Sequence, residues 1–228
     1  MKQKAVVKQK KKSKKKKVIV VEQKSTTAQK VALHALQKQL QVLRLKEWLV
    51  LIGFVFGAAL LRVPMQAVPS AEPLTFFAIL SGWMFGRRKG FLAGASSLYV
   101  SNFLVFGGPG PWTIFQAIGF GIAGFAGGFL RKKSKILECL IIVAIATLIF
   151  ETIMNLSSAM FFPASVLVLF FTAIPFTLTH LVSNSIFALF LPKAKELIYE
   201  KGNFNEREIC EKALKRYKDS KIYRLVKR

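Results

Sequence analysis

Two apolar stretches of the 228-residue chain carry polar side chains at helical spacing. The first set is Glu151, Asn155 and Ser158, at i, i+4 and i+7, and the second is Thr177, His180 and Asn184, at i, i+3 and i+7. Each set occupies one face of a helix. Such groups are costly to bury among apolar residues, and they usually face an interior. Because the two stretches are consecutive, we expect the two faces to meet, as a binding site for a polar solute or as a polar zipper that holds two helices together.

Further polar side chains lie where other apolar stretches end. They are Arg62, Glu72, Asn102, Trp112 and Gln116. Two interpretations are open for Arg62 and Glu72. They can pair with each other across a loop in water, where a bridge contributes about 0 to 1 kcal/mol. Alternatively, they hold a polar molecule.

Residues 107–128 contain eight of the 15 glycines, and Gly119, Gly121 and Gly124 spell G-x-G-x-x-G. In a dinucleotide-binding loop this motif follows a buried strand. Here a Gly-Pro turn precedes it instead, and small residues recur at four-residue spacing from Gly119 through Ala123. Such spacing lets helices approach closely in a membrane. The pattern therefore predicts helix contact rather than a cofactor loop.

Enzyme motifs are missing from the sequence. It has no H-E-x-x-H, no G-x-S-x-G and no G-x-x-x-x-G-K-[ST] motif, and its single aspartate is Asp219. Cys139 and Cys210 do not have the spacing of a metal or redox site. We therefore expect no enzymatic activity, no catalytic residues, no metal and no cofactor in this chain. An intramembrane enzyme is the least favoured class.

The composition favours a membrane protein, since 53% of the residues are hydrophobic while the net charge is +24. These two extremes fit one chain only if charged and apolar residues are segregated. A spanning helix needs about 20 mostly apolar residues, and shorter ones are tolerated when neighbours shield them. Six candidate spans follow, at residues 48–65, 74–86, 91–106, 112–130, 136–161 and 166–191.

The distribution of Lys and Arg indicates the orientation, because these residues are enriched in cytoplasmic loops. With the amino terminus inside, residues 1–47, 87–89, 131–135 and 192–228 are cytoplasmic and hold 34 of the 35 basic residues. Only Arg62 is outside. The fold class expected is an all-α membrane protein, a compact six-helix transmembrane bundle with both termini cytoplasmic, located in the cell membrane.

The flanks of the membrane domain have their own patterns. Residues 1–28 read as a Lys-rich disordered tail, and residues 29–46 as a basic amphipathic helix at the inner leaflet. The latter carries a leucine stripe of Leu33, Leu36, Leu40 and Leu43. The membrane domain follows at 47–192 and a charged cytoplasmic tail at 193–228. The Lys run is predicted to attract anionic lipid. Nucleic acid is the weaker alternative and is not expected as a partner.

The order of landmarks resembles the substrate-binding (S) subunits of energy-coupling factor (ECF) transporters. The resemblance covers about residues 47–192. It rests on these motifs: Pro69-Ser70-Ala71-Glu72-Pro73, Ser81-Gly82-x-x-Phe85-Gly86 with Gly90 and Gly94, Ser101-Asn102, Gly108-Pro109-Gly110-Pro111-Trp112-Thr113-x-x-Gln116, and Pro175-Phe176 followed by His180 and Asn184.

The resemblance implies a six-helix subunit that captures a vitamin or a similar small organic micronutrient from outside. It also implies a transmembrane coupling subunit and ATPase subunits as partners, with ATP bound by the ATPases. The family often has an Ala-x-x-x-Ala patch in its first helix, where this chain has Gly53 and Gly57, the predicted partner interface. Nickel and cobalt members carry an amino-terminal histidine that Met1-Lys2-Gln3 does not match.

We therefore predict a substrate-capture membrane subunit of an ECF-type importer. Trp112 and Phe76 would cover the ligand and Arg62 would attract an anionic group. The predicted substrate-binding residues are Arg62, Glu72, Phe76, Asn102, Trp112, Gln116, Glu151, Asn155, Thr177 and His180. The alternative is a non-transporting membrane scaffold or assembly protein, whose interior polar residues serve packing alone.

Overall fold

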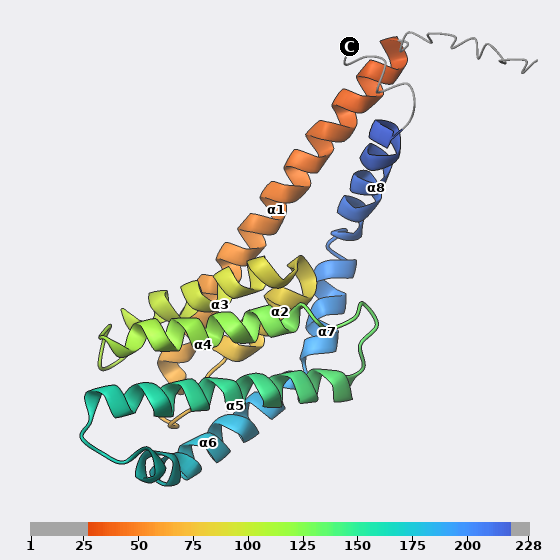
Figure 1. Ribbon diagram of the computed structural model, residues 1–228. Coiled ribbons are helices and arrows are strands. Elements are labelled where there is room, and N and C mark those ends of the chain that lie inside the picture. Colours follow the sequence, from red (N-terminus) through yellow and green to blue (C-terminus); the bar gives the residue numbers. More distant parts are fainter. Residues whose placement is uncertain (1–26, 220–228) are drawn as a thin grey trace, which may run out of the picture.

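The computed structural model describes residues 27–219, and all regular secondary structure in that range is helical (Figure 1). The predicted Lys-rich tail at 1–28 lies outside the described residues, except for its last two. The helices are α1 Thr27–Met65, α2 Leu74–Phe85, α3 Arg87–Asn102, α4 Trp112–Gly127, α5 Ile136–Phe161, α6 Val166–Ala188, α7 Leu191–Lys195, the π-helical turn η1 Glu196–Glu200 and α8 Asn205–Asp219.

Three of these helices, α1, α5 and α6, are long and apolar enough to cross a membrane. The chain thus has the character of a membrane protein. The predicted bounds of α5 are confirmed, as are the first residues of α2, α4 and α6. Helices α2 and α4 are apolar but shorter, and the 12 residues of α2 extend only about 18 Å. A hydrocarbon layer is about 30 Å thick, so the six-span arrangement stays a prediction.

Helix α1 is continuous through residue 46, where the sequence analysis divides it into an amphipathic helix and a span. The helix has no break at this position, because no Gly or Pro interrupts residues 27–52, and the division into an interfacial segment and a span stays a prediction. The first half of α1 extends away from the bundle together with α8 (Figure 1). Leu40 and Leu43 lie buried against Cys210 of α8. The leucine stripe predicted to face the inner leaflet is therefore covered in part by α8, and contact with lipid stays a prediction.

Helix α3 begins four residues before the predicted span at 91–106 and also ends four residues earlier. Gly86, with a φ of 94°, ends α2 and is the single residue between the two helices. Residues 87–89, predicted as a loop, form the first turn of α3 instead. Long basic side chains can extend from a helix end towards water, so their charge does not stop the helix.

Glycines bring α2, α3 and α4 into backbone contact. A Cβ atom added at Gly82 or Gly90 would collide with the carbonyl oxygen of Gly124. A Cβ at Gly94 would collide with the carbonyl of Phe120, and one at Gly127 with that of Ile79. The predicted helix contact is confirmed, and the G-x-G-x-x-G residues lie inside α4 rather than in a loop after a strand.

The predicted charged tail at 193–228 is helical as far as α8 and docks on α1. Glu47 of α1 is 2% exposed and forms ion pairs with Lys89 of α3 and Arg207 of α8. The hydrogen bonds that Arg207 donates to Glu47 raise the pKa of Arg207 above its usual range. This carboxylate thus holds three helices together at the end of the bundle where the basic segments lie.

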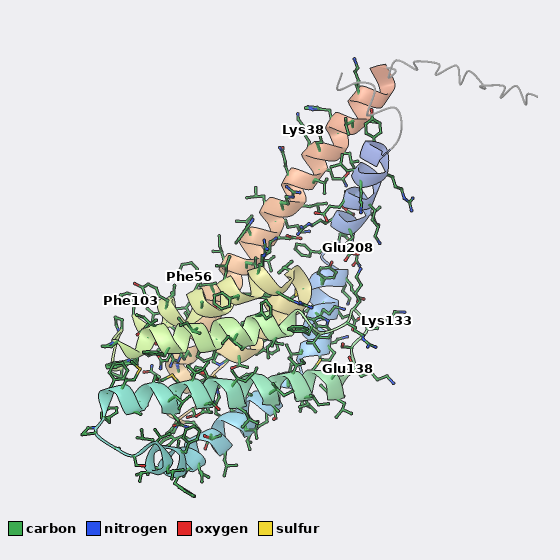
Figure 2. The ribbon with its side chains drawn as sticks, viewed as in Figure 1. Lys38, Phe56, Phe103, Lys133, Glu138 and Glu208 are labelled. Carbon is green, nitrogen blue, oxygen red and sulfur yellow. The ribbon has the colours of Figure 1, made fainter. Side chains whose placement is uncertain are left out.

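A second contact joins α8 to the loop between α4 and α5. Lys132 pairs with Glu208, and Figure 2 shows Glu208 on α8 near the loop that carries Lys133. The hydrogen bond from Lys132 lowers the pKa of Glu208 below its usual value of 4.5. Burial, together with the negative charge of Glu208, raises the pKa of Tyr199 to about 12. The Tyr199 hydroxyl donates to Glu208 over 3.2 Å.

Candidate solute-binding cavity

A cavity of about 420 Å³ lies at the end of the bundle opposite the basic segments. It is bounded by the end of α1, residues 66–72, the loop after α3, and helices α4, α5 and α6. Ligand pockets commonly measure about 300 to 1,000 Å³. The lining residues are Arg62, Gln66, Val68, Pro69, Ser70, Ala71, Glu72, Val105, Phe106, Gln116, Phe150, Glu151 and His180.

The segment between α1 and α2 places Glu72 in this cavity. Ser70 has a left-handed φ of 61°, and the Ala71 amide donates to the Val68 carbonyl over 3.1 Å. Pro73 then precedes the first residue of α2 and fixes the chain direction. The resulting turn folds inward, and Glu72 is only 7% exposed.

Arg62 of α1 contacts Glu72 and the end of α3. Its Nε lies 3.2 Å from Glu72 Oε2, and its Nη1 donates to Ser101 Oγ over 2.8 Å and to Asn102 Oδ1 over 2.9 Å. The Arg62 and Glu72 side chains are 18% and 10% exposed. The pairing that the sequence leaves open is therefore present, but it lies inside the protein rather than in water.

Asn102 continues this network into α4. Its Nδ2 donates to Thr113 Oγ1 and to Gln116 Oε1, both over 3.0 Å. Asn102 is 2% exposed and lies behind Gln116 rather than in the cavity lining. Its function in the structure is to orient Gln116 and Arg62.

His180 of α6 lies between two carboxylates. Its Nδ1 is 2.6 Å from Glu151 Oε1 of α5, and its Nε2 is 3.4 Å from Glu72 Oε1. Thr177 donates to Glu151 Oε2 over 3.3 Å. The ring of Phe150 meets the imidazole edge to face, with the centroids 5.3 Å apart. The predicted meeting of the polar faces of α5 and α6 is confirmed at these residues.

Asn184, one turn after His180, belongs to a separate polar cluster. Its Nδ2 donates to Thr75 Oγ1 of α2 over 3.2 Å and to Thr147 Oγ1 of α5 over 2.9 Å. All three residues are at least 97% buried, and the cavity does not reach them. Asn184 thus matches the polar zipper that was one of the two interpretations.

The cavity lining contains four ionisable side chains that contact one another in sequence. Arg62 pairs with Glu72, Glu72 approaches His180, and His180 pairs with Glu151. A buried charge is tolerated when it is paired in this way. The arrangement offers carboxylate, imidazole and amide groups to a polar solute. Within residues 27–219, no three His, Cys, Asp or Glu side chains are arranged to hold a metal ion.

Five predicted site residues lie outside the cavity lining, namely Asn102 and Thr177, which contact lining residues as described above, and the three that follow. Asn155 is 9% exposed and borders a separate hollow of about 210 Å³ next to Glu151 and Thr177. Phe76 packs with two other rings in the core, Phe77 and Phe187. Trp112 is 41% exposed at the start of α4. Neither Phe76 nor Trp112 covers the cavity as predicted, because their helices direct them elsewhere.

Other lining or supporting residues were not predicted. Gln66 accepts a hydrogen bond from the Phe106 amide over 2.8 Å, so it ties the two loops at the cavity mouth. Ser101 holds Arg62, and Phe150 packs on His180. Phe150 precedes Glu151 directly, and Ser101 precedes Asn102, so adjacency to a predicted polar residue was the available signal. Nothing in the sequence connects Gln66 to Phe106.

Residues 43–206 match a family described as "Family of unknown function (DUF6580)". This range extends from the middle of α1 to the start of α8 and includes every residue that lines the cavity. No curated protein and no solved structure matches the chain.

Proposed function

The chain belongs to DUF6580, a family of unknown function, and we propose that it is the substrate-capture membrane subunit of an ECF-type importer. It would bind a small polar organic micronutrient, such as a vitamin, in the cavity beside Arg62, Glu72 and His180. The observation that carries this proposal is a ligand-sized cavity of about 420 Å³ whose lining brings together charged side chains from separate helices.

The proposed topology has six membrane-crossing helices with both termini in the cytoplasm of a cell membrane. It is supported by the separation of charge, because Arg62 is the one Lys or Arg at the cavity end among residues 27–219. The backbone contacts among α2, α3 and α4 also support it, since close packing shields short helices from lipid. In this orientation the cavity opens to the outside.

The polarity of the cavity supports solute binding. Charged groups within a membrane bundle are expensive and generally mark a pathway or a site. Replacing a buried ion pair by apolar residues is often neutral or stabilising, so packing alone gives little reason to retain four ionisable groups. A solute that needs hydrogen bonds from carboxylate and amide groups gives such a reason.

Transport would depend on partners that supply energy, namely a transmembrane coupling subunit and ATPase subunits that bind ATP. Gly53 and Gly57 are the proposed coupling contact. They lie on a face of α1 where an added Cβ would meet nothing within 4 Å, next to exposed Ile52 and Phe56. A partner helix has room to approach there. The basic flanks would attract anionic lipid.

The test is uptake of radiolabelled vitamins by cells that express the chain with or without coupling and ATPase subunits. The substrate would first be identified by native mass spectrometry of the purified chain, as a co-purified small molecule. We expect uptake that requires the partner subunits and falls about 10- to 100-fold in Glu72→Gln, through loss of a hydrogen bond to a charged group. The exposed Glu138→Gln variant is the matched control. Uptake that continues without the partners would contradict the proposal.

A membrane scaffold is the second candidate, and one observation favours it. Arg62, Glu72, Glu151 and His180 are each paired within the protein, so the lining is complete without a ligand. A scaffold predicts that Glu72→Gln lowers the free energy of unfolding while no small molecule raises it. A ligand that protects the purified chain from unfolding would exclude a purely structural role for the cavity.

A further inference from the structure

Arg62 is less available to a ligand than its charge suggests. Its Nε faces Glu72, and its Nη1 donates to both Ser101 and Asn102. The guanidinium is therefore neutralised by a carboxylate and oriented by α3. This arrangement speaks against the sequence-based expectation that Arg62 receives an anionic group.

The remaining charge in the cavity belongs to Glu151, Glu72 and His180. A carboxylate that carries its charge only accepts hydrogen bonds, and an imidazole that faces a carboxylate through each nitrogen is favoured in its doubly protonated form. His180 has such a position, with Glu151 Oε1 at 2.6 Å and Glu72 Oε1 at 3.4 Å. With His180 as imidazolium and Arg62 positive, the two carboxylates are balanced and the lining is neutral.

We propose that the cavity binds a protonated amine in exchange for the proton of His180. This inference rests on the proposed function, and it names the substrate class of the same cavity. The ammonium group of the ligand would lie beside Glu72 and Glu151. There it would supply the positive charge that the His180 imidazolium supplies before binding. The cavity therefore selects cationic amines over acids.

The exchange keeps the charge balanced. Before binding, the lining contains Arg62 and the His180 imidazolium against two carboxylates. After binding, it contains Arg62 and the ligand ammonium against the same two carboxylates, with His180 neutral and one proton released to water. No covalent bond other than the imidazole N–H changes. An anionic ligand would instead leave an unpaired negative charge in a cavity with low dielectric, which is strongly unfavourable.

The other groups around His180 are compatible with this exchange. Phe150 of α5 presents its ring to the imidazole, Thr177 of α6 donates to Glu151, and Gln116 of α4 offers an amide. Arg62 is the only other charged side chain that faces these carboxylates among the residues that line the cavity. No second cation there can replace the lost proton, so the ligand itself has to supply the charge.

The test uses the purified full chain and ligand series in which one scaffold carries an amine, a carboxylate or a hydroxyl. Phenethylamine, phenylacetate and phenethyl alcohol form one such series. Thermal shift gives the ranking, and isothermal titration calorimetry in phosphate and in HEPES, neither of which is a cationic primary amine, gives the number of protons released. We expect the amines to bind best, with about one proton released on binding. Their affinity should rise about tenfold per pH unit over the pH range in which the unbound chain carries the His180 proton and the ligand is an ammonium ion.

Glu151→Gln should weaken amine binding about 10- to 100-fold, since it removes a charged acceptor. Glu138→Gln, at the other end of α5 (Figure 2), should leave binding unchanged. Melting of both variants without ligand reports whether they fold. If carboxylates bind better than amines, or if amines bind without proton release, the proposed exchange of an amine for the His180 proton is wrong. The proposed function, capture of a small solute, is not contradicted by that result. If no series binds to the folded chain, the proposed function fails as well.

Discussion

Replacing His180 by leucine tests the central ion pair of the cavity. The His180 and Glu151 side chains are 2% and 13% exposed, so the loss of the imidazole leaves a carboxylate with little access to water. Glu72 keeps Arg62 as a partner, so the cost falls mainly on Glu151. Breaking a buried pair by removing one partner costs about 3 to 5 kcal/mol. For a chain of this size, that corresponds to a melting temperature lower by about 6 to 20 °C.

The measurement is thermal unfolding of the detergent-purified chain, followed by intrinsic fluorescence. His34→Leu is the matched control, because His34 is exposed on the first half of α1, and it should melt as the unchanged protein does. The double variant Glu151→Leu, His180→Leu should regain most of the lost stability, since apolar replacement of a whole buried pair is often neutral. A loss below about 0.5 kcal/mol for His180→Leu, or a double variant as unstable as the single one, would refute the pairing.

Three further outcomes follow from other parts of the structure. Gly124→Val should lower the free energy of unfolding by about 1 to 3 kcal/mol, because the valine side chain would collide with the backbone of Gly90. Gly53→Val is the control and should unfold as the unchanged chain does, since a Cβ there meets nothing within 4 Å. Equal stabilities of the two variants would contradict the contact between α3 and α4. The lowered pKa of Glu208 stabilises α8 docking above pH 4.5, and this contribution is lost as the pH falls through the folded-state value. Hydrogen exchange in α8, corrected for its intrinsic pH dependence, should therefore increase on acidification, and an unchanged rate would count against the Lys132 contact. The thiols introduced by Arg88→Cys and Lys133→Cys should react only with thiol reagents that cross the membrane into the cytoplasm. Labelling by a membrane-impermeant reagent in the medium would overturn the proposed topology.

Helix positions were predictable from the sequence where apolar runs and turn residues agree. The bounds of α5 follow from a basic segment before Ile136 and a proline after Phe161. The start of α3 was missed because apolar character begins later than the helix does. The backbone requires only a glycine with positive φ at Gly86 and tolerates basic residues in the next turn.

The candidate site was predictable in so far as helical spacing defines it. The contact of Glu151 with Thr177 and His180 follows from two polar faces on consecutive helices. Phe76 shows the limit, because neighbouring positions on a helix differ by about 100° in direction. Thr75 and Phe76 therefore belong to different surroundings, and an error of one residue changes the environment. The contact between Gln66 and Phe106 depends on two loops 40 residues apart, and no local pattern encodes it.

The glycine contacts among α2, α3 and α4 also determine which parts of the protein can open the cavity. Side chains can rotate to let helices slide, but where carbonyl oxygens rest directly against glycine Cα atoms no such freedom exists. These three helices therefore move as one rigid unit, in which Asn102 and Gln116 keep fixed positions relative to each other. Any widening of the cavity for a solute therefore falls to α6 and the segment that carries Glu72, so spin labels on α3 and α4 should keep their separation on ligand binding while a label on α6 changes its distance to them.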